Sequence, residues 1–324
     1  MRKMTHAQYL ENDDWKIFRH ETITLGIQQM LLSAATVAGT KDGITRRANE
    51  DAYSVIEING TLICAVFDGT SSQKPIPELG EETGARFASH FLKNIFEEEQ
   101  CGVTPSEMTR TLNALLLKEN LKFKGASVDD VHSLPTSTAT IVQIDSENKE
   151  LAISHLGDSF CMLFYSDGHS ALVTEDKNRI HDEQTLALLQ KIADEKNCTP
   201  REARKDPRIK AAVIKMFQDT HNTSDGSGQG VMNGDPRAEK YIQDIRFPLE
   251  GIAALSLGSD GLIPPGWDEQ NESDRQKMYA ILKRGGVEEL IQVKQNREDA
   301  DSDWNFLRYK HSDDATAVFV EDLS

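Results

Sequence analysis

The sequence predicts an α+β fold, a β-sandwich of two antiparallel sheets flanked by helices. Strand-like apolar runs with turn signals between them occur in two blocks, over residues 32–68 and 138–173. Helical patterns stand between and after these blocks, at 80–98, 104–117, 274–284 and 287–293. Strands, two helices, strands, helices and a last strand is the element order of two packed sheets with helices outside.

The first block contains four strand-like runs. The run from Leu32 leads through Lys41-Asp42-Gly43, where Asp-Gly is a hairpin signal, to a second run. A third run spans Ala52 to Ile56, and the Asn59-Gly60 turn returns the chain to the apolar run Leu62 to Phe67. The third and fourth runs are therefore predicted to be neighbouring strands.

The middle of the chain predicts two helices followed by an antiparallel meander. Phe87, Phe91 and Ile95 recur every four positions on the first helix. The second helix begins at Thr104-Pro105-Ser106-Glu107, a capping box with Pro at its first position. Three strands follow, and Gly157-Asp158-Ser159 is the turn between the second and the third.

No linker rich in Pro, Ser or Gly divides the chain, so one large domain is expected over residues 32–324. Residues 1–31 mix charges with large apolar side chains, which predicts a partly helical N-terminal extension packed outside the domain. The character changes at about 175–245. Helix signals return there, a capping box opens at Thr199, and a loop rich in Gly, Ser and Asn runs over 220–234, so we interpret this segment as a mobile insertion or flap.

Composition excludes several classes of protein. The 324 residues include 53 acids and 36 bases, a net charge of -17, which disfavours binding to nucleic acid or to an anionic membrane. The four cysteines are widely spaced without a C-x-x-C pair, so neither a zinc knuckle nor a redox dithiol is indicated. No apolar run approaches the ~18 residues that cross a bilayer, and the start lacks a signal peptide. We therefore expect a cytoplasmic protein, with export by a specialised system left open and its oligomeric state undetermined.

Acids recur beside the strand-like runs. Asp68 and Gly69 end the apolar run of a strand covered on both faces, and Gly69 has no side chain to keep its carbonyl from a metal ion. The other acids in similar settings are Glu50, Asp51, Asp158, Asp260 and Asp313. Carboxylates that folding brings together repel one another unless divalent cations hold them, so the pattern predicts a hard-metal site. For Asp158 a plain hairpin turn remains the alternative.

Five motifs in order carry a family resemblance. They are Arg46-x-x-Asn49-Glu50-Asp51, Val66-Phe67-Asp68-Gly69, Thr136-Ser137-Thr138-Ala139 with Gly157-Asp158-Ser159, Ser259-Asp260-Gly261, and Asp313-Asp314-Ala315-Thr316-Ala317-Val318. The series resembles the metal-dependent protein serine/threonine phosphatases, the PPM or type 2C family, over about residues 32–321. Each motif alone is weak, and their shared order and setting make the match.

The resemblance implies a β-sandwich with two Mg2+ or Mn2+ ions in a cleft between the sheets. By position, Asp68 is expected to bridge the two ions. Asp260 and Asp313 are expected to complete one site, and Glu50 with the Gly69 carbonyl to hold the other. These assignments come from the resemblance, motif by motif.

Three further roles follow from the same resemblance. Asp51 is expected to orient metal-bound water, and Asp158 to contribute to a third, weaker metal beside Asp260. Arg46 is expected to grip the substrate phosphate, because a guanidinium offers phosphate a planar fork of donors.

The predicted function is hydrolysis of phosphoserine or phosphothreonine on proteins by a water that bridges two divalent cations, without a covalent intermediate. The sequence departs from the family pattern directly after Asp68-Gly69. The family usually has His or Met and two glycines there, and this chain has Thr70-Ser71-Ser72. In the family, a histidine at the first of these positions is thought to act as general acid. Two alternatives remain, an inactive PPM-fold binding or regulatory module and a phosphatase of small esters. The haloacid-dehalogenase signature is excluded, because Val66 stands where that family has its nucleophilic aspartate.

Overall fold

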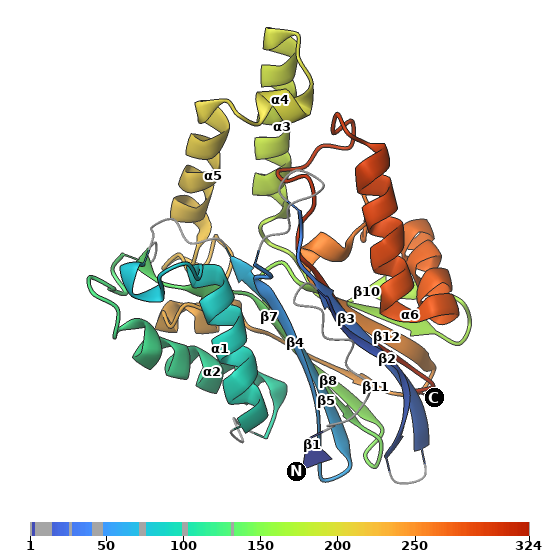
Figure 1. The fold of residues 1–324 in the computed structure, drawn as a ribbon. Helices are drawn as coiled ribbons and strands as arrows, with labels where there is room; N and C mark the ends of the chain where they lie inside the picture. Colours follow the sequence, from blue (N-terminus) through green and yellow to red (C-terminus); the bar gives the residue numbers. More distant parts are fainter. Residues whose placement is uncertain are drawn as a thin grey trace.

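The computed structural model describes residues 2–3, 15–25, 28–40, 48–70, 76–98, 103–130 and 133–323. Two antiparallel sheets lie face to face at the centre of the molecule, and helices cover their outer faces (Figure 1). The predicted α+β sandwich is confirmed. Arg46 and the turn predicted at 41–43 lie outside the described residues.

The first sheet has the strand order β1-β4-β5-β7-β8-β11, with β6 paired to β5. Its strands are β1 Arg2–Lys3, β4 Asp51–Ile58, β5 Thr61–Thr70, β6 Thr136–Ser137, β7 Ala139–Asp145, β8 Glu150–Leu156 and β11 Gln243–Pro248. Asn59 and Gly60 join β4 to β5 with φ values of 52° and 79°, which is the left-handed geometry of a tight hairpin turn. The register of this hairpin sets Asp51 directly opposite Asp68.

The second sheet has the order β10-β9-β12-β13-β3-β2. Its strands are β2 Trp15–Leu25, β3 Gln28–Val37, β9 Phe160–Tyr165, β10 Ser170–Leu172, β12 Ile252–Gly258 and β13 Ala315–Glu321. The central strand β13 has no polar side chain except Thr316 between Ala315 and Val320, and all six of these residues are buried. This is the pattern of a strand covered on both faces.

The predicted meander is wrong at one connection. β8 pairs with β7 and β11 in the first sheet, whereas β9 pairs with β10 and β12 in the second. Gly157-Asp158-Ser159 therefore carries the chain from one sheet to the other and is not a hairpin turn. Both strands are almost fully buried on both faces, so their sequence pattern does not reveal which strands they pair with.

The N-terminal segment is also different from expectation. Where residues 1 to about 30 were expected to be partly helical, the described ones form β1, β2 and the start of β3. In β2, Ile23 is buried in the core between the sheets while Thr22 and Thr24 are exposed. That alternation, with β-branched residues, is typical of an edge strand.

Three long helices cover the sandwich (Figure 1). α1 Gly84–Glu98 and α2 Pro105–Asn120 lie on the first sheet, and α6 Glu272–Ala300 lies on the second. The capping box predicted at Thr104 is present. The backbone is non-helical at Gly285 and Gly286 inside α6, where the sequence predicted two separate helices. Short helical turns occur at η1 Pro77–Leu79, η3 Pro236–Tyr241 and η4 Asp260–Leu262.

A second helical unit rises above one end of the sandwich (Figure 1). It consists of α3 Arg179–Lys196, α4 Pro200–Ala203 and α5 Pro207–Thr220, within the segment predicted as an insertion. Leu189, Ile192 and Ile209 form a small core of their own, against which Leu307 packs. The sequence analysis did not assign α5, although Asp206 caps its N-terminus and Pro207 opens it, as in many helices.

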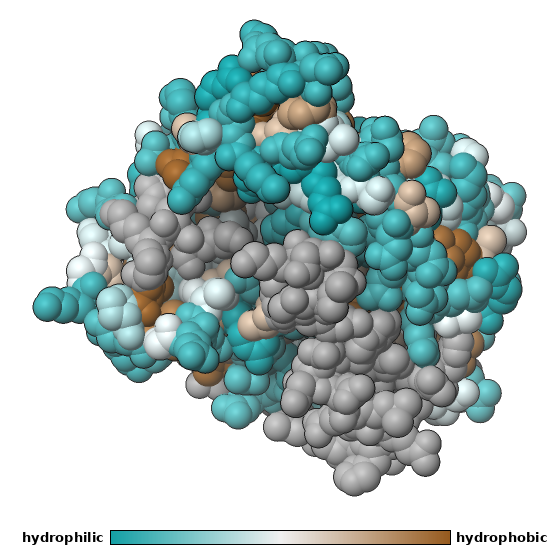
Figure 2. Space-filling view, turned by 45° about the horizontal axis from the view of Figure 1, so that its top comes forward, coloured by the Kyte–Doolittle hydropathy of each residue, from teal (hydrophilic) through white to brown (hydrophobic). Residues whose placement is uncertain are grey.

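The coloured part of the face seen in Figure 2 is mostly hydrophilic. Figure 2 shows hydrophobic residues on the viewed face as small, separated spots. No helix in the described part of the chain has both the length and the hydropathy needed to cross a membrane.

We expect Leu92→Ala on α1 to lower the free energy of unfolding by about 2–5 kcal/mol, because this side chain is fully buried against the first sheet and its loss leaves a cavity. Leu121 follows α2 and is 51% exposed, so Leu121→Ala should change stability by less than about 0.5 kcal/mol. Urea unfolding followed by circular dichroism measures both. Equal midpoints for the two variants would contradict the packing of α1.

Candidate metal centre

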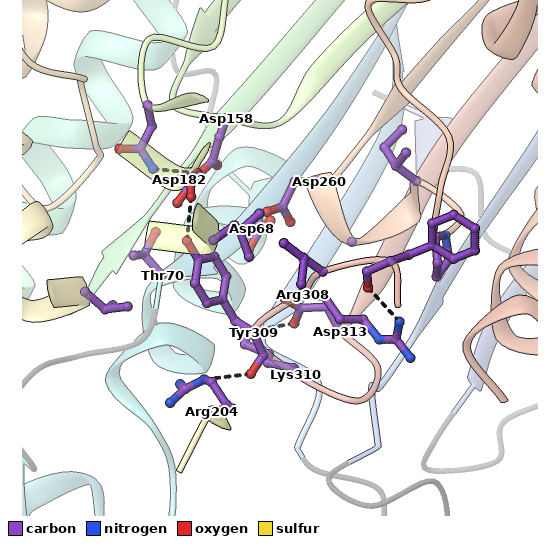
Figure 3. A pocket seen from close by; sticks show the side chains of 18 of the residues that line it. Asp68, Thr70, Asp158, Asp182, Arg204, Asp260, Arg308, Tyr309, Lys310 and Asp313 are labelled. Carbon is purple, nitrogen blue, oxygen red and sulfur yellow. Dashed lines mark hydrogen bonds and ion pairs between the residues drawn. The ribbon is translucent and has the colours of Figure 1, made fainter. Parts of the chain in front are cut away.

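Both sheets deliver acids to the same end of the sandwich. Asp68 lies on β5 two residues before its end, Asp260 opens η4 directly after β12, and Asp313 precedes β13. Asp158 lies on the connection between the sheets. Figure 3 shows Asp68, Asp158, Asp260 and Asp313 around one cavity. Four of the predicted residues, which span most of the sequence, are thus neighbours.

Asp68 is at the centre of this cluster. Its surroundings of protein atoms raise its pKa most, and the charges of Asp51, Asp260, Asp158 and Asp313 raise it further, in that order. These four neighbours are all residues that the sequence analysis singled out. The side chain is nevertheless half-buried and reaches the cavity.

Asp260 keeps more contact with solvent than the other acids, although protein atoms crowd it from several sides. Burial by these atoms is the largest cause that raises its pKa, and the charge of Asp313 is the second largest. The Lys310 ammonium lowers it. Lys310 Nζ lies 2.7 Å from Asp313 Oδ1. A cation of the chain therefore already partly neutralises the acids on this side of the cluster.

Asp51 is the most deeply buried acid of the cluster, with 2% of the residue exposed to solvent. Burial is the largest cause that raises its pKa, and the charge of Asp314 is the second largest. Hydrogen bonds from the hydroxyls of Ser259 and Thr316 lower it. Its Oδ2 atom accepts no hydrogen bond from any described residue. A buried carboxylate oxygen without a donor is costly, and a nearby cation or a water bound to one would relieve that cost.

Asp314 joins the two sheets behind the cluster. Its Oδ1 accepts a hydrogen bond from the Gly39 amide at 2.6 Å, and its Oδ2 accepts one from the Glu50 amide at 2.8 Å. One carboxylate thus ties the segment after β3 and the segment before β4 to β13. The sequence analysis named Asp314 only as part of the last motif and gave it no role.

Glu50 is buried, and its backbone carbonyl connects three elements. The carbonyl accepts hydrogen bonds from the Gly69 amide at 3.1 Å and from Ser89 Oγ on α1 at 2.5 Å. A Cβ atom on Gly69 would lie 2.5 Å from the carbonyl oxygens of both Glu50 and Ala85. Only glycine fits here, so its role includes close packing of β5 against the start of α1.

Ser137 and Thr138 position Asp68, a role that the sequence analysis did not give to these two residues of the third motif. The Asp68 carbonyl accepts hydrogen bonds from the Thr138 amide at 2.7 Å and from Ser137 Oγ at 2.9 Å. Thr138 Oγ1 lies 2.6 Å from Ser159 Oγ, beside Asp158. One short segment therefore fixes strand β5, which carries Asp68, relative to the connection that carries Asp158.

His155 holds the connection that carries Asp158. Its ring is fully buried, with Nε2 2.9 Å from the Gly157 carbonyl oxygen and Nδ1 2.9 Å from Thr140 Oγ1. Burial lowers the pKa of His155 to about 4, so the ring is neutral near pH 7. Nε2 must then donate to the carbonyl, and Nδ1 accepts from the threonine.

Two further acids join the cluster from the insertion. Burial raises the pKa of Asp182 to about 7, with smaller contributions from the charges of Asp260 and Asp176. Burial likewise raises the pKa of Asp176 to about 6. Both charges also raise the pKa of Asp158. The sequence analysis missed both: Glu175-Asp176-Lys177 is typical of a solvated, charged segment, and an acid in the first turn of a helix, as Asp182 is in α3, is common.

The acids border a cavity of about 730 Å3. Asp68, Gly69, Asp158, Asp260 and Asp313 line it, together with Thr70, whereas Glu50 and Asp51 lie behind its wall. The far side is formed by α5 and by the segment before β13. The cavity therefore gives a substrate access to the acids.

The donor set fits a hard cation. Carboxylate and carbonyl oxygens are the ligands that Mg2+ and Mn2+ prefer, and the unpartnered Asp51 oxygen adds a further acceptor. Among the described residues no three acid, His or Cys side chains are already arranged to hold an ion. A cation would have to draw the mutually repelling carboxylates closer together.

When a chelator removes metal ions, we expect the free energy of unfolding to fall as the pH rises from about 4 toward 7. The pKa of Asp182 in the folded protein, about 7, exceeds the ~4 of an unfolded chain, so the folded state binds its proton more tightly in this window. Asp182→Asn should reduce this pH dependence, and Asp303→Asn, at an exposed acid, should not. Thermal unfolding in EDTA across this range measures the slope; an unchanged slope in Asp182→Asn would contradict the role given to this carboxyl.

Comparisons with known proteins support the same architecture. The S. agalactiae serine/threonine phosphatase is 17% identical, with 90% of this chain and 99% of that one covered at a TM-score of 0.51. The Mycobacterium tuberculosis serine/threonine phosphatase PstP/Ppp is also 17% identical, with 90% and 98% covered at a TM-score of 0.50. At such identities the likeness shows a shared fold.

The sequence itself gives the stronger result. No curated protein matches it. Residues 38–289, more than half of the chain, match the family described as Protein phosphatase 2C. That range includes every acid of the cluster except Asp313 and Asp314. The chain belongs to the protein phosphatase 2C family.

Proposed function

We propose that this protein is a metal-dependent phosphatase that hydrolyses phosphoserine or phosphothreonine on proteins. The observation that carries the proposal is the position of Asp68, surrounded by four carboxylates from both sheets at the edge of an open cavity. Structural ion-pair networks also perturb carboxylates, but there the buried acids are paired with cations of the protein. Here five carboxylates lie together, and Lys310 compensates the charge of two of them: it lowers the pKa of Asp260 and forms an ion pair with Asp313.

The ligand assignment extends the family resemblance to this geometry. We assign Asp68 to both of two Mg2+ or Mn2+ ions, Asp260 and Asp313 to one of them, Glu50 with the Gly69 carbonyl to the other, and Asp158 to a third, weaker ion. When bound, two such cations lower the pKa of a shared water and neutralise charge on the phosphoryl group. The acids supply negative charge to hold them.

Other residues of the chain act on the substrate and on water. Asp51 Oδ2, buried and without a donor, accepts a hydrogen bond from water and so orients it. Arg46, outside the described residues, is assigned to the phosphate oxygens. Thr70 lines the cavity in the place of the usual His or Met, so we assign protonation of the leaving group to water rather than to a side chain.

We expect hydrolysis of p-nitrophenyl phosphate and of a phosphothreonine peptide to require Mn2+ or Mg2+ and to stop in EDTA. Asp68→Ala should lower kcat/KM by more than ~100-fold, because it removes a group in contact with both ions. Asp167→Ala is the matched control, since Asp167 also precedes a glycine but is 71% exposed in a turn.

The outcomes separate the alternatives. Turnover of the small ester without the peptide would favour a phosphatase of small molecules. A folded protein that hydrolyses neither substrate with either metal would sink the enzymatic proposal, and the protein would then be a PPM-fold binding or regulatory module.

A further inference from the structure

The wall of the cavity that faces the acids is an apolar stripe on α5. Val213, Ile214 and Phe217 recur at helical spacing and line the cavity. All three are half-buried, and none belongs to the core clusters of the sheets or of the helical unit. Ile209, one turn before Val213, is the residue of α5 that packs in the small core. The stripe therefore offers apolar surface to whatever occupies the cavity.

A cation stands at the outer end of this stripe. Lys210 precedes Val213 by three residues, lines the cavity and is exposed. It forms no hydrogen bond or ion pair with another residue in the described part of the chain. The other cations that line the cavity are engaged: Arg308 with Asp301, Lys310 with Asp313, Lys294 with Glu298, and Arg204 with the Tyr309 carbonyl. Lys210 is thus available to an anionic group of a ligand.

The geometry of α5 sets the spacing and the order of these two features. Lys210 and Phe217 are seven residues apart, which is roughly 10 Å along a helix. An extended peptide covers that distance in about three residues. α5 descends from α4 toward the sheets, so its Phe217 end is nearer the acids and its Lys210 end is farther out (Figure 1).

We propose that this wall is a substrate subsite for phosphopeptides that carry an apolar residue next to the phosphorylated residue and an acidic residue about three positions farther away. The inference rests on the proposed phosphatase function and adds a substrate class to it. The phosphate lies at the acids, the apolar side chain contacts Val213 and Phe217, and the acidic side chain pairs with Lys210. The cavity volume, about 730 Å3, is within the range of ligand sites and exceeds what one phosphorylated side chain fills.

The test uses phosphothreonine peptides of one length that differ at two positions on the same side of the phosphothreonine. One set has both positions N-terminal to it, and a second set has both C-terminal. The adjacent residue is Leu or Ala, and the residue three positions beyond it is Asp or Lys. Wild-type kcat/KM with Mn2+ should favour Leu over Ala by about 10-fold, as expected for filling an apolar pocket. It should favour Asp over Lys by about 2- to 5-fold, the usual effect of one exposed ion pair.

Variants show which residues carry each preference. Lys210→Glu should invert the charge preference, so that the Lys peptide becomes the better substrate; a merely destabilised protein would not do this. Phe217→Ala should remove the preference for Leu, and Phe217→Leu should retain it. Lys191→Glu is the matched control, because Lys191 is exposed on α3 and does not line the cavity, and both preferences should persist in it.

Each failure has a distinct meaning. Equal turnover of all peptides by the wild type, or an unchanged charge preference in Lys210→Glu, would overturn the subsite while leaving the phosphatase function intact. Turnover of p-nitrophenyl phosphate without any peptide would overturn the peptide as occupant. Absence of metal-dependent turnover of every substrate would overturn the proposed function, and the subsite with it.

Discussion

Repulsion among carboxylates at the junction of the two sheets is the constraint on which this structure depends. Folding brings four other carboxylates close to Asp68. The raised pKa of Asp68 reflects the free-energy cost of this repulsion and of burial. A protein gains nothing in stability from such a cluster by itself. The arrangement is explained if divalent cations bind there and offset the repulsion.

The surrounding hydrogen bonds hold the acids in place against this repulsion. Asp314 connects segments of both sheets through backbone amides, and Thr138 fixes the Asp68 carbonyl. Lys294, at 2% exposure on α6, donates to the Asp313 carbonyl at 2.7 Å and pairs with Glu298. These contacts reach the backbone of the acid-bearing segments and leave the carboxylate oxygens of Asp68 and Asp260 directed at the cavity (Figure 3).

The sequence predicted the parts of the fold that depend on local pattern. The β4–β5 hairpin followed from Asn59-Gly60, and the start of α2 from the capping box at Thr104. The crossing between the sheets at Asp158 could not be predicted, because a strand buried on both faces carries no mark of its partner. Likewise, Thr138 and Asp182 act through residues distant in the chain, and no short motif records such contacts.

Binding of Mn2+ itself, measured by calorimetry on the metal-free protein near pH 7, tests the central claim most directly. We expect two tightly bound ions per chain, loss of both in Asp68→Asn, and retention of both in Asp158→Asn, which would affect only the third, weaker ion. Binding that is absent in the wild type, or that is unchanged in Asp68→Asn, would contradict the assignment of this cluster as a metal centre.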